Sequence, residues 1–116
     1  MAQVRSIDMA TPEQLVLLRQ YQAAHRAQCA AMDGMLRRAL RHVADCALLD
    51  LVRACDGSTS EVAQLAQVVH QVMAQRETIR RAGTASLPGM EQMTTERLAV
   101  LQGREDQARG ALFALA

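Results

Sequence analysis

The 116-residue chain contains no tryptophan, lysine or asparagine, and Tyr21 and Phe113 are its only aromatic residues. Sheet-favouring residues are scarce, and only 6 glycines and 2 prolines are present to interrupt helices. Alanine, leucine, arginine and glutamine favour helix, and they number 21, 14, 13 and 12. Because half of the chain is hydrophobic and 22% is charged, the composition predicts one folded, all-α domain.

Membrane-spanning runs and a charge excess are also missing. No uncharged apolar stretch approaches the roughly 20 residues that cross a bilayer, and residues 1–10 contain no signal-peptide core. Three cysteines, an odd number, favour free thiols, so we expect a cytoplasmic protein without membrane contact. Thirteen arginines against twelve acids give a net charge of +1, which disfavours nucleic acid as a partner. Arginine as the only cationic side chain besides histidine indicates a GC-rich, bacterial genome.

Helix signals divide the chain into a flexible arm over residues 1–10 and a helical domain over residues 11–116. Thr11 to Gln14 read as a capping box with proline at the first helical position. The helical pattern then continues to about Asp56, and Gly57 ends it. Ser58 to Glu61 read as a second capping box, opening a helix that ends at Gly83. A third pattern runs from about Pro88 to the C-terminus, with Gly103 and Gly110 weakening it.

The dipeptide Asp33-Gly34 leaves two architectures open. A heptad-like apolar seam runs through it, typical of a coiled coil, with members at Leu18, Met32, Leu36 and Val43. A continuous helix, slightly favoured by the neighbouring residues, gives an antiparallel bundle of three long helices with a kink in the first. Such a helix leaves part of its seam uncovered and predicts a homodimer or a heteromeric complex. A turn at Asp33-Gly34 gives four helices in an up-down bundle.

Two His-x-x-x-Cys pairs, His25 with Cys29 and His42 with Cys46, are candidate metal ligands. Residues four apart share a helix face, and two His with two Cys can hold zinc tetrahedrally. Two copies of a continuous helix crossing antiparallel would bring His25 opposite Cys46 and Cys29 opposite His42. In a hairpin, the cysteines diverge and this set fails. Small core cysteines are the competing interpretation.

Beyond these two His–Cys pairs, the sequence contains few residues arranged for catalysis or ligand binding. A His–Cys pair on a regular helix, without a glycine-rich loop or oxyanion donors, is a poor active site, so we expect no enzymatic activity. Arginine clusters at 37, 38 and 41 and at 76, 80 and 81 are either solvated helix faces or docking sites for an acidic partner or nucleic acid.

The sequence as a whole predicts a small adaptor or regulator that packs a helix against a partner protein. The expected partner-binding residues are apolar anchors with flanking charges: Leu36, Leu40 and Val43 with Arg37 and Arg41. Bacterial secretion chaperones and anti-activators are analogous in size and class. The alternatives are a metal- or thiol-responsive sensor that uses His25, Cys29, His42 and Cys46 with zinc as the candidate cofactor, and a nucleic-acid accessory protein that uses the arginine clusters.

Overall fold

The computed structural model describes residues 9–83, 89 and 91–116, and within them the chain forms four α helices. These helices are α1 (Pro12–Ala30), α2 (Gly34–Ala54), α3 (Glu61–Gly83) and α4 (Glu91–Phe113). The all-α prediction is confirmed, and the four-helix alternative is the one the chain adopts. Most of the expected arm, residues 1–8, lies outside the described residues. No helix in the described ranges has the length and apolar character to cross a membrane.

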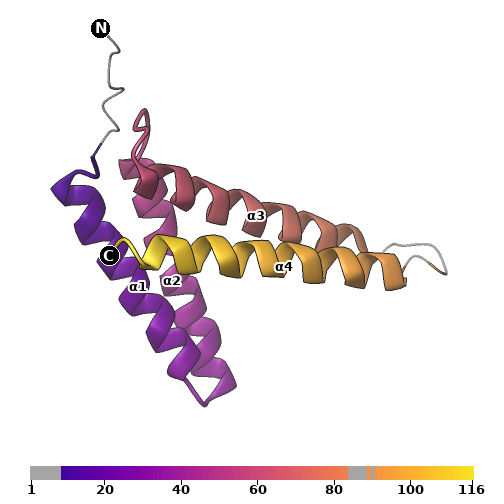
Figure 1. Cartoon of the computed structure of the whole chain (residues 1–116). Helices are drawn as coiled ribbons and strands as arrows, with labels where there is room; N and C mark the ends of the chain where they lie inside the picture. The colour runs from indigo at the N-terminus through magenta and orange to yellow at the C-terminus, as the bar shows by residue number, and fades with distance from the viewer. Residues whose placement is uncertain (1–8, 84–88, 90) are drawn as a thin grey trace, which may run out of the picture.

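The bundle consists of two antiparallel hairpins, α1–α2 and α3–α4, that cross at an angle (Figure 1). The start of α1, the end of α2, the start of α3 and the end of α4 meet at one corner. From there the hairpins diverge, so the molecule is elongated and flat, with extents of 60 × 38 × 20 Å. The arrangement leaves an open inner angle between the hairpins.

The chain turns at Asp33 because the polar groups of both helix ends find partners there. The Asp33 carboxylate accepts hydrogen bonds from the backbone N–H of Met35 at 2.7 Å and of Leu36 at 3.1 Å. Arg37 donates from Nη2, at 2.8 Å, and from Nε to the carbonyl of Ala31, which follows the last residue of α1. Two local caps therefore stabilise the break, which the apolar residues beside it did not indicate.

The heptad-like seam does not survive this break as one buried stripe. Leu18 is fully buried, but Met32 is 94% exposed, and Leu36 and Val43 are each exposed by about half. Because the chain reverses at Asp33, the part of the seam on α2 no longer continues the part on α1. No residue that the structure describes covers the apolar side chains of Met32, Leu36 and Val43 at the hairpin end.

The hydrophobic core lies at the corner where all four helices meet. Its members come from every helix and include Leu18, Leu48, Leu51, Val69 and Leu112. Each of these five is at most 1% exposed. Gly57 follows α2 and has a φ of 73°, a backbone conformation that residues with a side chain rarely adopt. This conformation lets the chain turn towards α3.

A buried hydrogen bond joins the caps of α1 and α3. The predicted capping box at Thr11 and Gln14 is confirmed. The second predicted box is wrong by two residues, because Ser60 caps α3 by accepting from the N–H of Ala63 at 3.1 Å. The Ser60 hydroxyl also donates to Gln14 Oε1 at 3.0 Å. This contact between residues 46 positions apart favours Ser60 over Ser58 as the cap, and a local sequence pattern does not contain it.

We expect Gln14→Ala to lower the free energy of unfolding by about 1–3 kcal/mol, because it leaves the Ser60 hydroxyl buried without its acceptor. Urea denaturation followed by circular dichroism measures this change. Gln20→Ala, at an exposed glutamine of the same helix, is the control and should shift the free energy by less than about 0.5 kcal/mol. Equal losses in the two variants would contradict the role of the buried bond.

Candidate functional site

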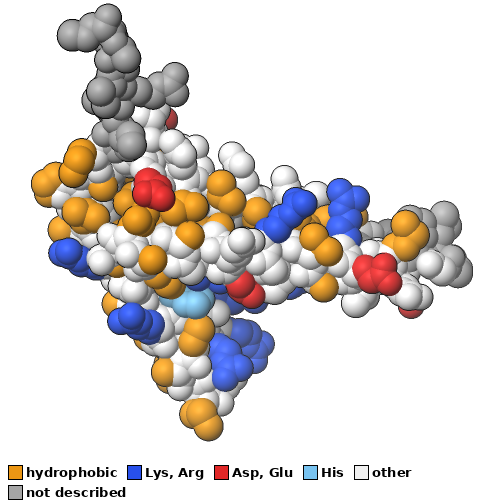
Figure 2. Space-filling view, viewed as in Figure 1, with side chains coloured by type: hydrophobic (Ala, Val, Ile, Leu, Met, Phe, Trp, Pro, Cys, Tyr) orange, Lys and Arg blue, Asp and Glu red, His pale blue; other side chains and the backbone are white. Residues whose placement is uncertain are grey.

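A cavity of about 380 Å³ lies in the inner angle between the hairpins. Figure 2 shows a histidine and arginine side chains gathered at this angle, below α4. All four helices line the cavity, and half of its lining residues are charged. The charged residues are Arg41, Asp45, Arg76, Arg80, Glu105, Asp106 and Arg109.

Glu105 and Arg109 form the floor of the cavity, four residues apart on α4. Glu105 is 3% exposed and Arg109 is 8% exposed. The Arg109 Nη2 donates a hydrogen bond to Glu105 Oε2, and Arg76 Nη2 on α3 lies 3.1 Å from Glu105 Oε1. One buried carboxylate thus pairs with guanidinium groups from two helices. Removing one partner of such an ion pair leaves the other charge buried without compensation, which lowers the stability of the fold.

Arg109 also links α4 to the first hairpin. Its Nε donates to the Tyr21 hydroxyl at 2.9 Å, and its Nη1 lies 3.3 Å from the partly exposed Asp106. Burial raises the pKa of Tyr21, and Arg109 opposes that change only in part. The phenol is therefore a neutral acceptor at physiological pH.

Three rings pack beside this network in edge-to-face contacts. The ring centroid of Tyr21 lies 5.3 Å from that of Phe113, and the centroid of His25 lies 5.5 Å from that of Phe113. Burial, together with the positive charge of Arg109, lowers the pKa of His25 from its ordinary value of 6.5. At neutral pH the imidazole is therefore uncharged.

The rim of the cavity carries charges that are less completely paired. Arg41 on α2 makes no hydrogen bond or ion pair with any residue that the structure describes, although its charge lowers the pKa of Asp45. Burial outweighs that effect and raises the pKa of Asp45. Arg80 on α3 lies 3.8 Å from Glu77, with both side chains about half exposed. Such an exposed pair contributes little stability.

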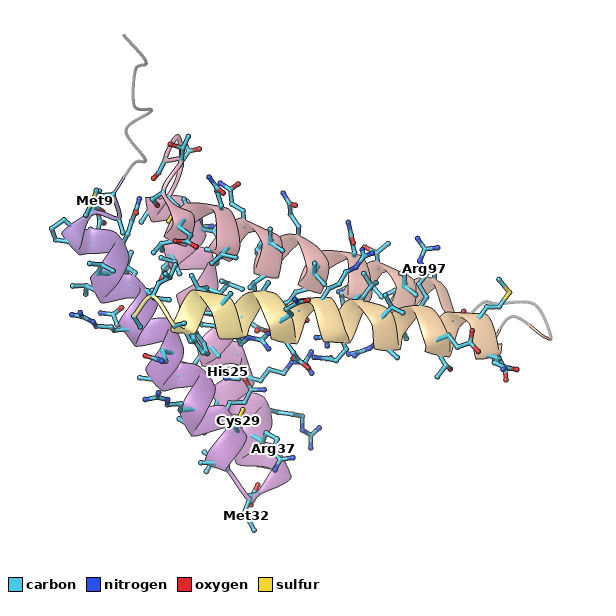
Figure 3. The ribbon with its side chains drawn as sticks, viewed as in Figure 1. Met9, His25, Cys29, Met32, Arg37 and Arg97 are labelled. Carbon is cyan, nitrogen blue, oxygen red and sulfur yellow. The ribbon has the colours of Figure 1, made fainter. Side chains whose placement is uncertain are left out.

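The structure brings each His–Cys pair together but does not bring the two pairs into one site. Cys29 Sγ lies 3.7 Å from His25 Nδ1, and Cys46 Sγ lies 3.7 Å from His42 Nε2. His25 and Cys29 line the cavity, where Figure 3 shows them below α4, whereas the other pair is outside its lining. The described residues hold no cluster of three or more His, Cys, Asp or Glu placed for a metal. The break at Asp33 also removes the single long helix that the predicted dimer register requires, so a zinc site stays a prediction.

The predicted partner-binding residues divide between two surfaces. Leu36 and Val43 are each about half exposed, and Leu40 is partly buried. Arg41, five residues and about 140° around the helix from Leu36, lines the cavity. Arg37 is exposed and holds the turn through the carbonyl of Ala31. Sequence reasoning therefore combined residues that face different directions.

The sequence analysis missed the network of Tyr21, Glu105 and Arg109. A signal was present, because Leu101, Ala108 and Leu112 leave position 105 as the missing member of an apolar stripe. Arg76 occupies the equivalent gap in the stripe of α3. A carboxylate and an arginine at apolar positions of neighbouring helices indicate a buried ion pair.

Replacing Glu105 by Gln should lower the free energy of unfolding by about 3–5 kcal/mol, because two arginines lose their buried counter-charge. Chemical denaturation of the variant measures the loss. Asp106→Asn is the matched control, since the Asp106 side chain is 60% exposed and bonds the same Arg109. It should cost about 1 kcal/mol or less. A small loss for Glu105→Gln would mean that the buried network does not hold the hairpins together.

We expect the folded protein to lose stability as the pH falls below about 6.5, because the unfolded chain takes up a proton at His25 that the folded chain resists. Above that pH the contribution of His25 is fully present. Thermal unfolding between neutral and mildly acid pH, compared with His25→Gln, isolates it, since the variant should show a weaker pH dependence. His42→Gln, at an exposed histidine that also lies four residues before a cysteine, is measured in parallel as the matched substitution. Identical profiles for His25→Gln and wild type would refute this assignment.

Known proteins give no independent guide to the use of this site. Comparison of the chain with models of protein families, with curated proteins and with solved structures found no match. The function is therefore argued from the geometry and chemistry of the described residues alone.

Proposed function

We propose that the protein is a non-enzymatic adaptor that binds a helix of a partner protein at the end of the α1–α2 hairpin. One observation carries this proposal. Nine large hydrophobic residues are exposed in the described chain, and four of them lie between positions 32 and 43. These four are Met32, Met35, Leu36 and Val43. The other five are dispersed, and single exposed apolar residues are ordinary on protein surfaces.

The type of side chain supports helix docking at this end. Met32 is 94% exposed and Met35 is 78% exposed, and Figure 3 shows Met32 at the extreme end of the hairpin. Methionine is flexible and polarizable, so it adapts to the shape of an apolar partner surface. Leu36 and Val43, seven residues apart, extend this surface along one side of α2. We call these four residues the hairpin-end surface.

Charge around the hairpin-end surface indicates the chemistry of the partner. Arg26, Arg37 and Arg38 lie in this part of the chain, and Asp33 is the only acid among residues 26–43. The Asp33 carboxylate already caps α2. An amphipathic helix with acidic residues beside its apolar stripe would match both the apolar residues and the arginines.

The arginine pattern gives less support to the nucleic-acid alternative. In the second cluster, Arg76 pairs with the buried Glu105, and Arg81 pairs with Glu77. These acids offset the charge that phosphate groups would need. A basic surface remains at the hairpin end, where it adjoins apolar side chains.

The proposal predicts that a partner co-purifies with the wild-type chain at fixed stoichiometry in native mass spectrometry of complexes isolated from its own host. Leu36→Ser with Val43→Ser should abolish that complex, because both replacements remove half-exposed apolar anchors. Arg26→Glu with Arg38→Glu, at two exposed arginines outside the cavity lining, should weaken it at least about tenfold by placing acids against an acidic helix.

The matched control is Val68→Ser with Val100→Ser, two exposed valines on the α3–α4 hairpin. This variant should keep the complex intact. Loss of the complex in the control, with binding retained in the α2 variants, would move the interface to α3–α4 and overturn the proposal. A bare homodimer whose formation depends on Leu36 and Val43 would make a second copy the partner and overturn the acidic-helix assignment.

A further inference from the structure

We propose that the cavity in the inner angle is a binding site for a small organic anion that carries a carboxylate or phosphate group, held between Arg41 and Arg80. This site is separate from the hairpin-end surface, and its function does not require the adaptor proposal to be correct.

The volume and the lining of the cavity suit a small ligand. At about 380 Å³ it falls within the range of roughly 300–1,000 Å³ that is usual for small-molecule sites. Side chains from all four helices line it. A ligand there would touch both hairpins at once and would bridge the angle between them.

The balance of charge in the cavity is positive. Four arginines and three carboxylates line it. On the floor, Glu105 pairs with Arg76 and with Arg109, and Asp106 pairs with Arg109 as well. These contacts use the Arg109 guanidinium on all three of its nitrogens, because Nε donates to Tyr21. The floor is therefore fixed and holds no free cation for a ligand.

The free positive charge lies at the rim. Arg41 has no ion-pair or hydrogen-bond partner among the described residues, and Arg80 has only a loose, half-exposed contact with Glu77. Asp45 is the one remaining carboxylate of the lining, and with all three carboxylates ionised the four arginines still leave the lining a net positive charge. Two guanidinium groups from opposite hairpins are thus available to one anion.

Cys29 makes the site accessible to experiment. Its thiol lines the cavity, whereas Cys46 is exposed elsewhere and also has a histidine 3.7 Å from its sulfur. Cys46 is therefore an internal control in the same molecule. Cys55 is buried, with an exposure of 0%, and should react far more slowly with alkylating reagents.

The first measurement compares alkylation by anionic iodoacetate and neutral iodoacetamide, with each cysteine followed by mass spectrometry of its own peptide. The ratio of the iodoacetate rate to the iodoacetamide rate should be roughly threefold or more higher at Cys29 than at Cys46, because the cavity attracts the anion. Equal ratios at the two cysteines would overturn the positive character of the site.

The second measurement uses inorganic phosphate and citrate as probes, at an ionic strength held constant with sodium chloride. Either probe should slow the iodoacetamide reaction of Cys29 at least about threefold and leave Cys46 unchanged. Arg41→Gln and Arg80→Gln should each remove this protection, while Arg38→Gln, at an exposed arginine of α2 outside the cavity lining, should retain it.

Circular dichroism spectra must match the wild type for these variants to be compared. Absence of protection by both probes in the wild-type chain would overturn the proposal. Protection that persists in both Arg41→Gln and Arg80→Gln would overturn the assignment of these arginines. Neither experiment involves the partner protein, so failure here and failure of the adaptor proposal are distinguishable.

Discussion

The buried carboxylate of Glu105 is the constraint on which the relation between the two hairpins depends. It pairs with Arg76 across the α3–α4 hairpin and with Arg109, which in turn donates to Tyr21 of α1. Two arginines at this depth are tolerated only because a carboxylate and a phenol satisfy them. The apolar core lies at the corner where the four helices meet. The Glu105 network fixes the positions of α1, α3 and α4 relative to one another beside the inner angle.

The crossing of the hairpins has two consequences for the surface. The ends that diverge from the corner lack the neighbours that a closed four-helix bundle would supply, so Met32, Met35 and Leu36 stay exposed. The inner angle is too polar to close by hydrophobic packing, since half of its lining is charged. An apolar surface at the hairpin end and a charged cavity in the inner angle therefore arise from the same crossing of the hairpins.

The candidate site was only partly predictable from the sequence. The His25–Cys29 pair was identified because residues four apart on a helix share a face, and this spacing needs no tertiary information. Arg41 was identified as a flanking charge, but its place in the cavity depends on how α2 is rotated against α3 and α4. Glu105 and Arg109 were missed because a charge at an apolar position has meaning only when its partner from another helix is known.

The sequence by itself determined the all-α class, the capped start of α1 at Thr11 and the end of the helical pattern before Gly57, because these depend on backbone propensities and hydrogen bonds within a few residues. Tertiary structure decided features that local sequence signals did not determine. It used Ser60 rather than Ser58 as the cap of α3, and it set the angle between the hairpins. Each of these outcomes depends on contacts between residues distant in the sequence or on the packing of one helix against another, and such interactions leave no periodicity for a single sequence to reveal.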